Sequence, residues 1–181
     1  TGGFTDCMLK NGAAVVYAVD VGHGQLHPSL CADPRVVNLE GTDARSLAAV
    51  STIPPNAVGL VTADVSFISV KAVLPAVRPF LTPNARLVVL IKPQFEAGRQ
   101  AVGKRGVVRD PRVHRRVLDD MLRFFAEEGL RLDRLTFSPI TGGEGNIEYL
   151  AVLTAPPAGG SPICPDTKSV VDEAFAALSA R

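Results

Sequence analysis

Three apolar runs that end in charged residues constrain the fold of this chain more than any other feature. The runs and the residues that follow them are Ala14–Val19 with Asp20, Ala57–Ala63 with Asp64, and Arg86–Ile91 with Lys92. Short runs of aliphatic and β-branched residues are typical of buried parallel strands. Strands that alternate with helices predict an α/β fold, a mostly parallel sheet covered by helices on both faces. Ligands bind at the carboxyl ends of such strands, so the charged residues mark the expected site.

The remaining segments continue this pattern. Further strands are expected at 35–39, 130–137 and 147–153, and helices at 4–11, 42–51, 66–80 and 111–128. In the helix at 66–80, apolar residues from Phe67 to Val77 recur every three or four positions. Composition changes at Ala155, which predicts one domain over 1–154, a linker over 155–165 and a terminal helix over 166–181.

Composition and cysteine spacing exclude several classes of protein. No apolar run approaches the ~20 residues of a membrane helix, and the first residues lack the pattern of a signal peptide. Cys7, Cys31 and Cys164 are widely spaced and suggest no metal site. We therefore expect a cytoplasmic protein with reduced thiols, no metal and no membrane partner. The net charge is only +1, so any basic surface is local.

A glycine pair and an acidic strand end suggest a nucleotide-type cofactor. Gly2 and Gly3 precede a predicted helix, whose N-terminal amides favour anionic groups. Asp20 follows at the distance at which an acid accepts a ribose hydroxyl in dinucleotide sites. A plain turn and a loop aspartate explain the same residues equally well. His23, between two glycines, is interpreted as a solvated loop residue rather than as a base.

Asp64, Lys92 and Glu148 form the candidate catalytic cluster. Asp64 and Lys92 end strands that are expected to be neighbours, and Glu148 lies at the start of the last strand. Ionisable groups that converge at strand ends are candidates for catalysis. Two structural alternatives remain open: Asp64 caps the helix that begins near Ser66, and Glu148 is a solvent-facing strand residue.

A basic stretch follows Lys92 in the sequence. Its members from the loop and the start of the next helix are Arg99, Lys104, Arg105, Arg109 and Arg112. Such a face is often only solvated. Phosphate contacts also supply much of nucleic-acid affinity, so an anionic polymer that crosses this stretch is the functional interpretation.

Seven strings occur in a fixed order along residues 1–154. They are TGGFTD, YAVDVGHGQL, DPRVV, DVSFIS, IKPQFEAG, GVVRDP and SPITGGEGNIEYL. In these strings the chain resembles the TlyA family, hemolysin-like proteins that are FtsJ-type ribosomal RNA 2′-O-methyltransferases. The resemblance implies a Rossmann-like fold, S-adenosylmethionine as cofactor, and methyl transfer to a ribose 2′-hydroxyl, of cytidine in the family case. It also implies ribosomal RNA or a ribosomal subunit as partner.

The resemblance also implies roles for individual residues. Asp64, Lys92 and Glu148 match three members of a Lys-Asp-Lys-Glu catalytic set. The residues that match the cofactor site are Thr1, Gly2, Gly3, Asp20, Val21, Thr42, Asp43 and Asp64. The other catalytic lysine, the first strand of the sheet and an S4 RNA-binding domain lie upstream in the family, so we expect this chain to lack them.

The strand-end lysine fits the chemistry of this reaction. A 2′-hydroxyl must lose a proton as it attacks, and a lysine that burial has made neutral can take that proton. Neighbouring carboxylates oppose this effect, in which case Asp64 and Glu148 steer an ammonium group instead. Two other functions stay open: a nicotinamide-dependent oxidoreductase on a similar sheet, and an inactive RNA-binding or hemolysin-like remnant. The oligomeric state is not predicted.

Overall fold

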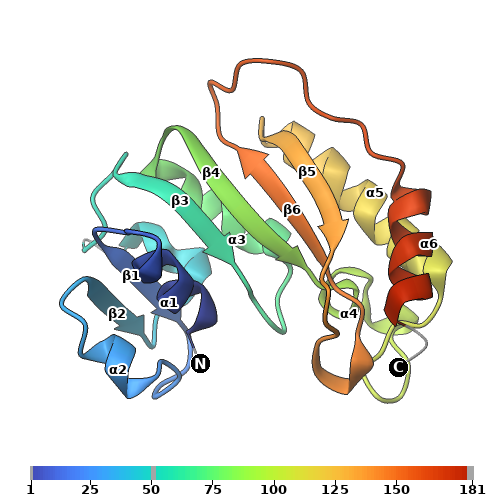
Figure 1. Cartoon of the computed structure of the whole chain (residues 1–181), viewed down its shortest axis with the longest axis horizontal. Coiled ribbons are helices and arrows are strands. Elements are labelled where there is room, and N and C mark those ends of the chain that lie inside the picture. Colours follow the sequence, from blue (N-terminus) through green and yellow to red (C-terminus); the bar gives the residue numbers. More distant parts are fainter. Residues whose placement is uncertain (1, 50–51, 179–181) are drawn as a thin grey trace.

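The computed structural model describes residues 2–49 and 52–178, and two sheets form its frame (Figure 1). In the first sheet, β1 (Val16–Asp20) pairs with β2 (Val36–Glu40). The second sheet has the order β3-β4-β6-β5, and its strands are β3 (Val58–Ala63), β4 (Leu81–Ile91), β5 (Arg131–Phe137) and β6 (Tyr149–Thr154). These bounds lie close to the predicted strands, except that β4 begins earlier.

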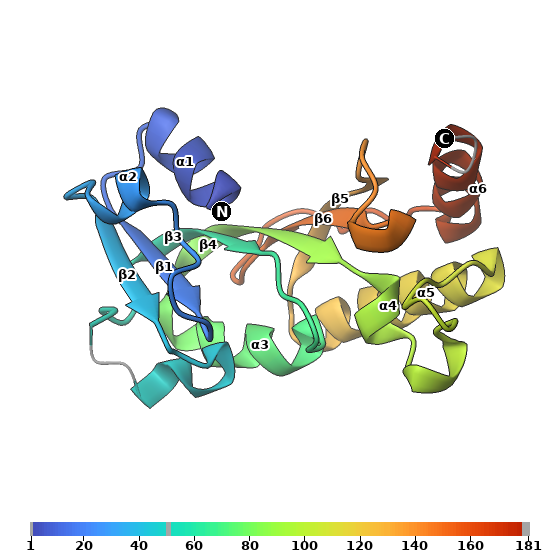
Figure 2. The same ribbon diagram turned by 90° about the horizontal axis from the view of Figure 1, so that it is seen from below.

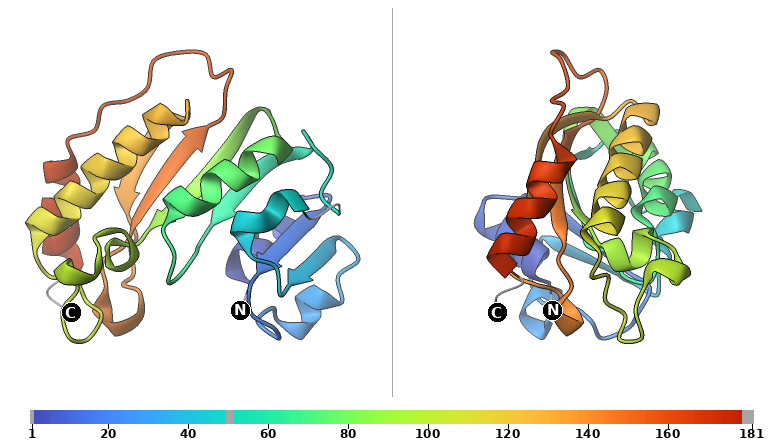
Figure 3. Two further views of the ribbon diagram at one scale, coloured as in Figure 1. Left: turned by 180° about the vertical axis from the view of Figure 1, so that it is seen from behind. Right: turned by 90° about the vertical axis from the view of Figure 1, so that its right-hand side faces the viewer.

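Helices lie on both sides of the two sheets (Figures 2 and 3). They are α1 (Gly3–Lys10), α2 (Pro28–Cys31), α3 (Val70–Val77), α4 (Pro93–Glu96), α5 (Pro111–Glu127) and α6 (Thr167–Leu178). Figure 2 shows α3 and α5 on one side of the strands, and α1 and α6 on the other. The predicted α/β class is confirmed. None of the helices in the described parts of the chain is long and apolar enough to cross a membrane.

One strand, β6, departs from the parallel arrangement expected for the sheet. β1 and β2 are parallel, as are β3 and β4, but β6 runs antiparallel to both β4 and β5. The reason is the connection: β5 and β6 follow each other through a loop without a crossover helix, which returns the chain in the opposite direction.

An open slot separates the two sheets. Among the described residues, β1 pairs only with β2, and β3 only with β4, so one edge of each strand faces the other without a partner. A cavity of about 960 Å³ lies there, lined by both strands and by residues of α1 and α3. Val15 and Leu60 line this slot and are 51% and 44% exposed, although strands covered on both faces normally bury such side chains.

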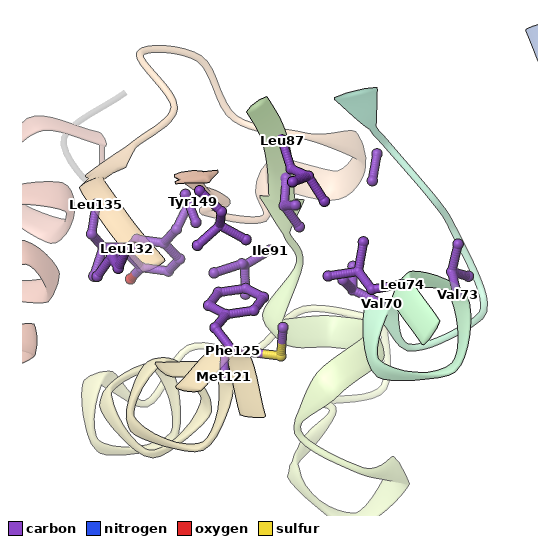
Figure 4. Packing of buried hydrophobic residues seen from close by; sticks show 14 of the residues in the cluster. Val70, Val73, Leu74, Leu87, Ile91, Met121, Phe125, Leu132, Leu135 and Tyr149 are labelled. Carbon is purple, nitrogen blue, oxygen red and sulfur yellow. The ribbon is translucent and has the colours of Figure 1, made fainter. Parts of the chain in front are cut away.

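The main core lies between the second sheet and helices α3 and α5 (Figure 4). In this view Val70 and Leu74 of α3 lie below Leu87 of β4, while Met121 and Phe125 of α5 lie below Ile91. All six of these side chains are buried, with exposed fractions of 4% or less. This packing fixes the direction of β4, and so the place where Lys92 leaves the core.

Two predicted helices differ from the structure. The segment expected at 66–80 becomes helical only at Val70, because Ser69 is its N-cap and accepts a hydrogen bond from the Lys71 amide. Phe67, expected on the buried face, is 92% exposed and has a positive φ of 64°. The segment expected at 42–51 holds a 3-10 segment over Ala44–Ala49, and residues 50 and 51 lie outside the described part.

A buried histidine ties α5 to β6. His114 is 1% exposed, its Nε2 lies 2.8 Å from the Val108 carbonyl oxygen, and its Nδ1 lies 2.9 Å from the Tyr149 hydroxyl. A carbonyl only accepts, so Nε2 carries the proton and Nδ1 accepts from Tyr149. Burial lowers the pKa of His114, which therefore stays neutral in the fold.

We expect the free energy of unfolding to fall as the pH is lowered from about 7.5 to 5. The unfolded histidine takes up a proton near pH ~6.5, whereas folded His114 resists protonation, so its contribution is full above that pH and is lost below it. The loss is at most about 1.4 kcal/mol per pH unit. Urea titrations across this range measure it. His114→Phe should flatten the pH dependence and His23→Gln, an exposed control, should not; equal slopes in all three proteins would contradict the assignment.

Candidate active site

Lys92 and Asp64 meet where β4 and β3 end. The Lys92 Nζ atom lies 2.7 Å from Asp64 Oδ1, and the two side chains are 12% and 47% exposed. Nζ also donates to Ser66 Oγ at 3.0 Å. Asp64 is therefore an ion-pair partner, and the helix cap that was its structural alternative is supplied by Ser69. The lysine has a carboxylate neighbour, which favours steering over burial alone as the explanation of its position.

Glu148 lies at the same edge of the sheet. The antiparallel pairing of β4 with β6 ends at Ile91 opposite Tyr149, so Lys92 and Glu148 are the next residues of the two strands. Glu148 is 7% exposed, which sets aside the solvent-facing alternative. Its Oε1 accepts a hydrogen bond from Gln94 Nε2 at 3.0 Å. Ser66 and Gln94 were not predicted as site residues, and both follow charged strand ends within two positions.

The short helix α4 connects the end of β4 with the loop that follows Asp64. Pro93 ends β4 and begins α4, and the turn then makes contacts on both sides. Glu96 accepts hydrogen bonds from Ser69 Oγ at 2.6 Å and from the Val70 amide at 2.8 Å, which holds the start of α3. The ring of Phe95 lies 5.2 Å from that of Phe67 between centroids. The turn thus fixes the loop that carries Asp64 and leaves Phe67 as an exposed ring beside it.

The glycine pair forms the start of α1. Gly2 is the N-cap and has a φ of 109°, which favours glycine, and no side chain caps this helix. A Cβ at Gly2 would lie 2.6 Å from Leu30 Cδ1, whereas a Cβ at Gly3 would meet nothing within 4 Å. The first amides of α1 are therefore reachable at Gly3. Thr1, the third predicted member, lies outside the described residues.

The other predicted cofactor residues separate into two groups. Gly2, Gly3, Asp20 and Asp64 line the slot between the sheets, together with Glu40, which was not predicted. Val21, Thr42 and Asp43 are not among its lining residues. Val21 is 71% exposed beyond the end of β1.

Two acids near the slot organise backbone turns. Asp20 Oδ1 accepts from the Gly22 amide at 2.7 Å, which shapes the turn after β1. Glu40 Oε1 accepts from the Gln25 amide at 2.9 Å, and hydrogen bonds from this loop, that of Gly24 first, lower the pKa of Glu40. Asp43 is instead engaged by Arg45, whose guanidinium lowers the pKa of Asp43 to about 2.

The predicted basic residues lie on one exposed loop and the start of α5. All five of them are exposed: Arg99, Lys104, Arg105, Arg109 and Arg112. Lys104, Arg105 and Arg109 line an open hollow of about 420 Å³. Asn146 holds this loop, since its Nδ2 donates to the Gly106 carbonyl at 3.1 Å and its Oδ1 accepts from the Val108 amide at 3.4 Å. Asn146 is two positions from Glu148, so the basic loop is tied to the segment that carries the glutamate.

Comparison with known proteins gives a consistent family. A family model described as FtsJ-like methyltransferase matches residues 1–155. "Putative rRNA methyltransferase YqxC" of Bacillus subtilis is 52% identical over 159 residues, which cover 88% of this chain and 56% of that protein. "16S/23S rRNA (cytidine-2'-O)-methyltransferase TlyA" of Mycobacterium tuberculosis is 47% identical over 157 residues, 84% of this chain and 56% of that protein.

A solved structure supports the same relationship. The "Putative hemolysin from Streptococcus thermophilus" is 41% identical and superimposes with a TM-score of 0.89, covering 99% of this chain and 65% of that chain. The chain spans 56% of the length of each of the two curated relatives above. The resemblance found in the sequence is confirmed, and the chain belongs to the FtsJ-like methyltransferase family.

Proposed function

We propose that this chain is the catalytic domain of an S-adenosylmethionine-dependent enzyme that methylates a ribose 2′-hydroxyl in ribosomal RNA, with cytidine as the target nucleoside. The observation that carries the proposal is the Lys92–Asp64 pair at 2.7 Å, at the end of the slot that Gly2, Gly3 and Asp20 line. The similarity to TlyA of Mycobacterium tuberculosis, named as a 16S/23S rRNA (cytidine-2'-O)-methyltransferase, supports the choice of substrate.

The residues present fit S-adenosylmethionine. The start of α1 has no side-chain cap, so its amides suit the cofactor's carboxylate, and Gly3 leaves open space in front of them. Asp20, at the end of β1, suits the ribose hydroxyls. Val21, Thr42, Asp43 and Asp64 complete the proposed cofactor site, together with Thr1. When bound, S-adenosylmethionine supplies an electrophilic methyl group on a positively charged sulfur.

The side chains at the strand ends orient the hydroxyl and remove its proton. Lys92 is fixed by Asp64 and Ser66, so its Nζ atom has a defined position at the edge of the slot. Lys92 either takes the proton of the 2′-hydroxyl as a neutral amine or steers the hydroxyl as an ammonium group. Glu148, held at the adjacent strand end, orients the hydroxyl or the lysine. Such alignment contributes up to ~7–11 kcal/mol in good intramolecular reactions.

Two surface features support a nucleic-acid substrate. The basic loop offers cations for phosphates, and Phe67 offers an exposed ring on which a nucleobase can stack. A positive φ is uncommon for a bulky residue, and such strain is found where a conformation serves a function. We propose ribosomal RNA or a ribosomal subunit as the partner, and the cytoplasm as the location.

The proposed domain extends over residues 1–154, followed by a linker over 155–165 and the terminal helix. α6 docks on the domain, because Thr167 Oγ1 donates to Asp119 of α5 at 2.7 Å and the ring of Phe175 lies 4.9 Å from that of His114. The helix was expected over 166–181. It is described over Thr167–Leu178, and residues 179–181 lie outside the described part.

The basic loop gives a prediction about salt. Replacing Arg105, Arg109 or Arg112 by alanine should weaken RNA binding and lower the slope of log K against log salt by ~1 for each lost phosphate contact. Filter-binding titrations at several salt concentrations measure this slope. Arg123→Ala is the matched control, since Arg123 lies further along α5 and pairs with Asp120 at 3.3 Å. Unchanged slopes in the first three variants would return these residues to the solvated-surface interpretation.

The function itself is tested with labelled S-adenosylmethionine and ribosomal subunits. The full-length protein should bind S-adenosylmethionine but not NAD in calorimetry, and should transfer the labelled methyl group to a ribose in ribosomal RNA. NAD binding in its place would favour the oxidoreductase, and binding of RNA without any transfer would favour the inactive module.

A further inference from the structure

Two residues without an assigned catalytic role, Gln94 and Gly142, lie close to the Glu148 carboxylate. On one side, Gln94 Nε2 donates to Glu148 Oε1 at 3.0 Å. On the other side is Gly142, where an added Cβ would lie 2.4 Å from the same Oε1 and 2.8 Å from the carboxyl carbon. Glu148 is 7% exposed, so these neighbours and not solvent fix its carboxylate.

Among the described residues, the Gln94 carboxamide makes a hydrogen bond through its nitrogen but not through its oxygen. Its Oε1 is the buried side-chain oxygen that, in the described parts of the chain, has no hydrogen-bond partner. Buried polar atoms are normally paired, and an unpaired acceptor destabilises a fold. The side chain is thus oriented for its donor alone, toward Glu148. In the described structure, the hydrogen bond to Glu148 is therefore the contact that orients the Gln94 side chain.

Gly142 is a glycine because of the carboxylate and not because of its backbone. Its φ of −73° and ψ of −170° are extended values that other residues adopt. The next residue, Gly143, has open space around its Cβ position. An alanine at 142 would therefore meet the far end of one flexible side chain, and that carboxylate would have to move.

We propose that Gln94 and Gly142 are positioning residues of the methyl-transfer reaction and that both act through Glu148. This inference rests on the proposed function. Gln94 follows Lys92 by two residues in the α4 turn, and Gly142 lies in the loop before β6, so the two residues link the carboxylate to both sides of the site. Misplacing an aligned group by about 1 Å costs ~10²-fold in rate, which is the effect expected here.

Gly142→Ala and Gly143→Ala form a matched pair of variants. Gly142→Ala should lower kcat by ~10–10²-fold, with KM for RNA and the midpoint of thermal unfolding close to those of the wild type. Gly143→Ala should keep wild-type activity. A crystal structure of Gly142→Ala should show the Glu148 carboxylate displaced, a readout that does not depend on activity. A loss of activity that follows a loss of folding in both variants would overturn the proposal.

A double-mutant cycle tests whether Gln94 acts through Glu148. Gln94→Leu should lower kcat in the wild-type background and should have little further effect in Glu148→Gln, because the partner that it orients is already altered. Gln100→Leu, at an exposed position, is the control and should leave kcat unchanged. Multiplicative losses in the double variant would overturn the proposal. An inactive wild-type protein would instead count against the proposed function, so the two failures are distinguishable.

Discussion

Replacing Lys92 by methionine is expected to lower kcat for methyl transfer by ~10²–10⁴-fold, the usual contribution of a general acid or base. Methionine keeps the length and apolar stem of the lysine but can neither accept a proton nor pair with Asp64. Lys92 Nζ is held by Asp64 at 2.7 Å and by Ser66 at 3.0 Å, so the variant removes the group around which the site is organised. The affinity for S-adenosylmethionine should stay within about threefold, because the proposed cofactor contacts come from other residues.

Lys92→Arg separates proton transfer from steering. Arginine keeps the positive charge and can pair with Asp64, but it does not lose its proton in proteins. If Lys92 takes the proton, Lys92→Arg should be nearly as inactive as Lys92→Met. If Lys92 only steers, the arginine variant should recover much of the activity, and the base role would be rejected. Lys168→Met is the matched control, since it removes another lysine–aspartate pair, Lys168–Asp172 at 2.6 Å, on α6.

The frame of the fold could be predicted because strand signals are local. The three apolar runs lie in β1, β3 and β4, and Asp20, Asp64 and Lys92 stand at the ends of these strands. The runs could be identified without knowledge of distant contacts. The helical pattern beginning at Phe67 was misleading for the opposite reason. Its start is set by the N-cap Ser69 together with Glu96, which is distant in sequence and accepts from the Val70 amide, and no local periodicity reports such a contact.

Local sequence signals also predicted part of the candidate site. Charged residues at strand ends identified Lys92 and Asp64, because neighbouring parallel strands bring their carboxyl ends together. Gln94 and Gly142 were missed, since a glutamine in a turn and a glycine in a loop are ordinary until Glu148 lies between them. The direction of β6 was also missed, because composition does not reveal whether a connection crosses the sheet.

The slot between β1 and β3 leads to the second large prediction: one further β-strand, parallel to both, completes the sheet. Each of these strands has a facing edge without a partner among the described residues, and the cavity of about 960 Å³ is lined by apolar side chains such as Val15 and Leu60. A strand edge with unpaired backbone groups and apolar side chains favours pairing with a further strand. The TlyA-like resemblance implies a strand at this place, and both curated relatives are longer than this chain.

Supplying that strand should stabilise the domain by about 5 kcal/mol, because two or three apolar side chains at ~1.5–3 kcal/mol each would be buried. At ~2–4 °C per kcal/mol for a domain of this size, the midpoint of thermal unfolding should rise by about 10–20 °C. The test fuses to residue 1 the segment that precedes the matched region in the Bacillus subtilis relative. Hydrogen exchange should then slow at the amides of β1 and β3. The control carries a proline in the middle of the added strand, which removes a ladder hydrogen bond and should cancel much of the gain. If both fusions melt at the temperature of residues 1–181 alone, and the amides of β1 and β3 exchange as before, the added strand does not pair in the slot and the prediction is wrong.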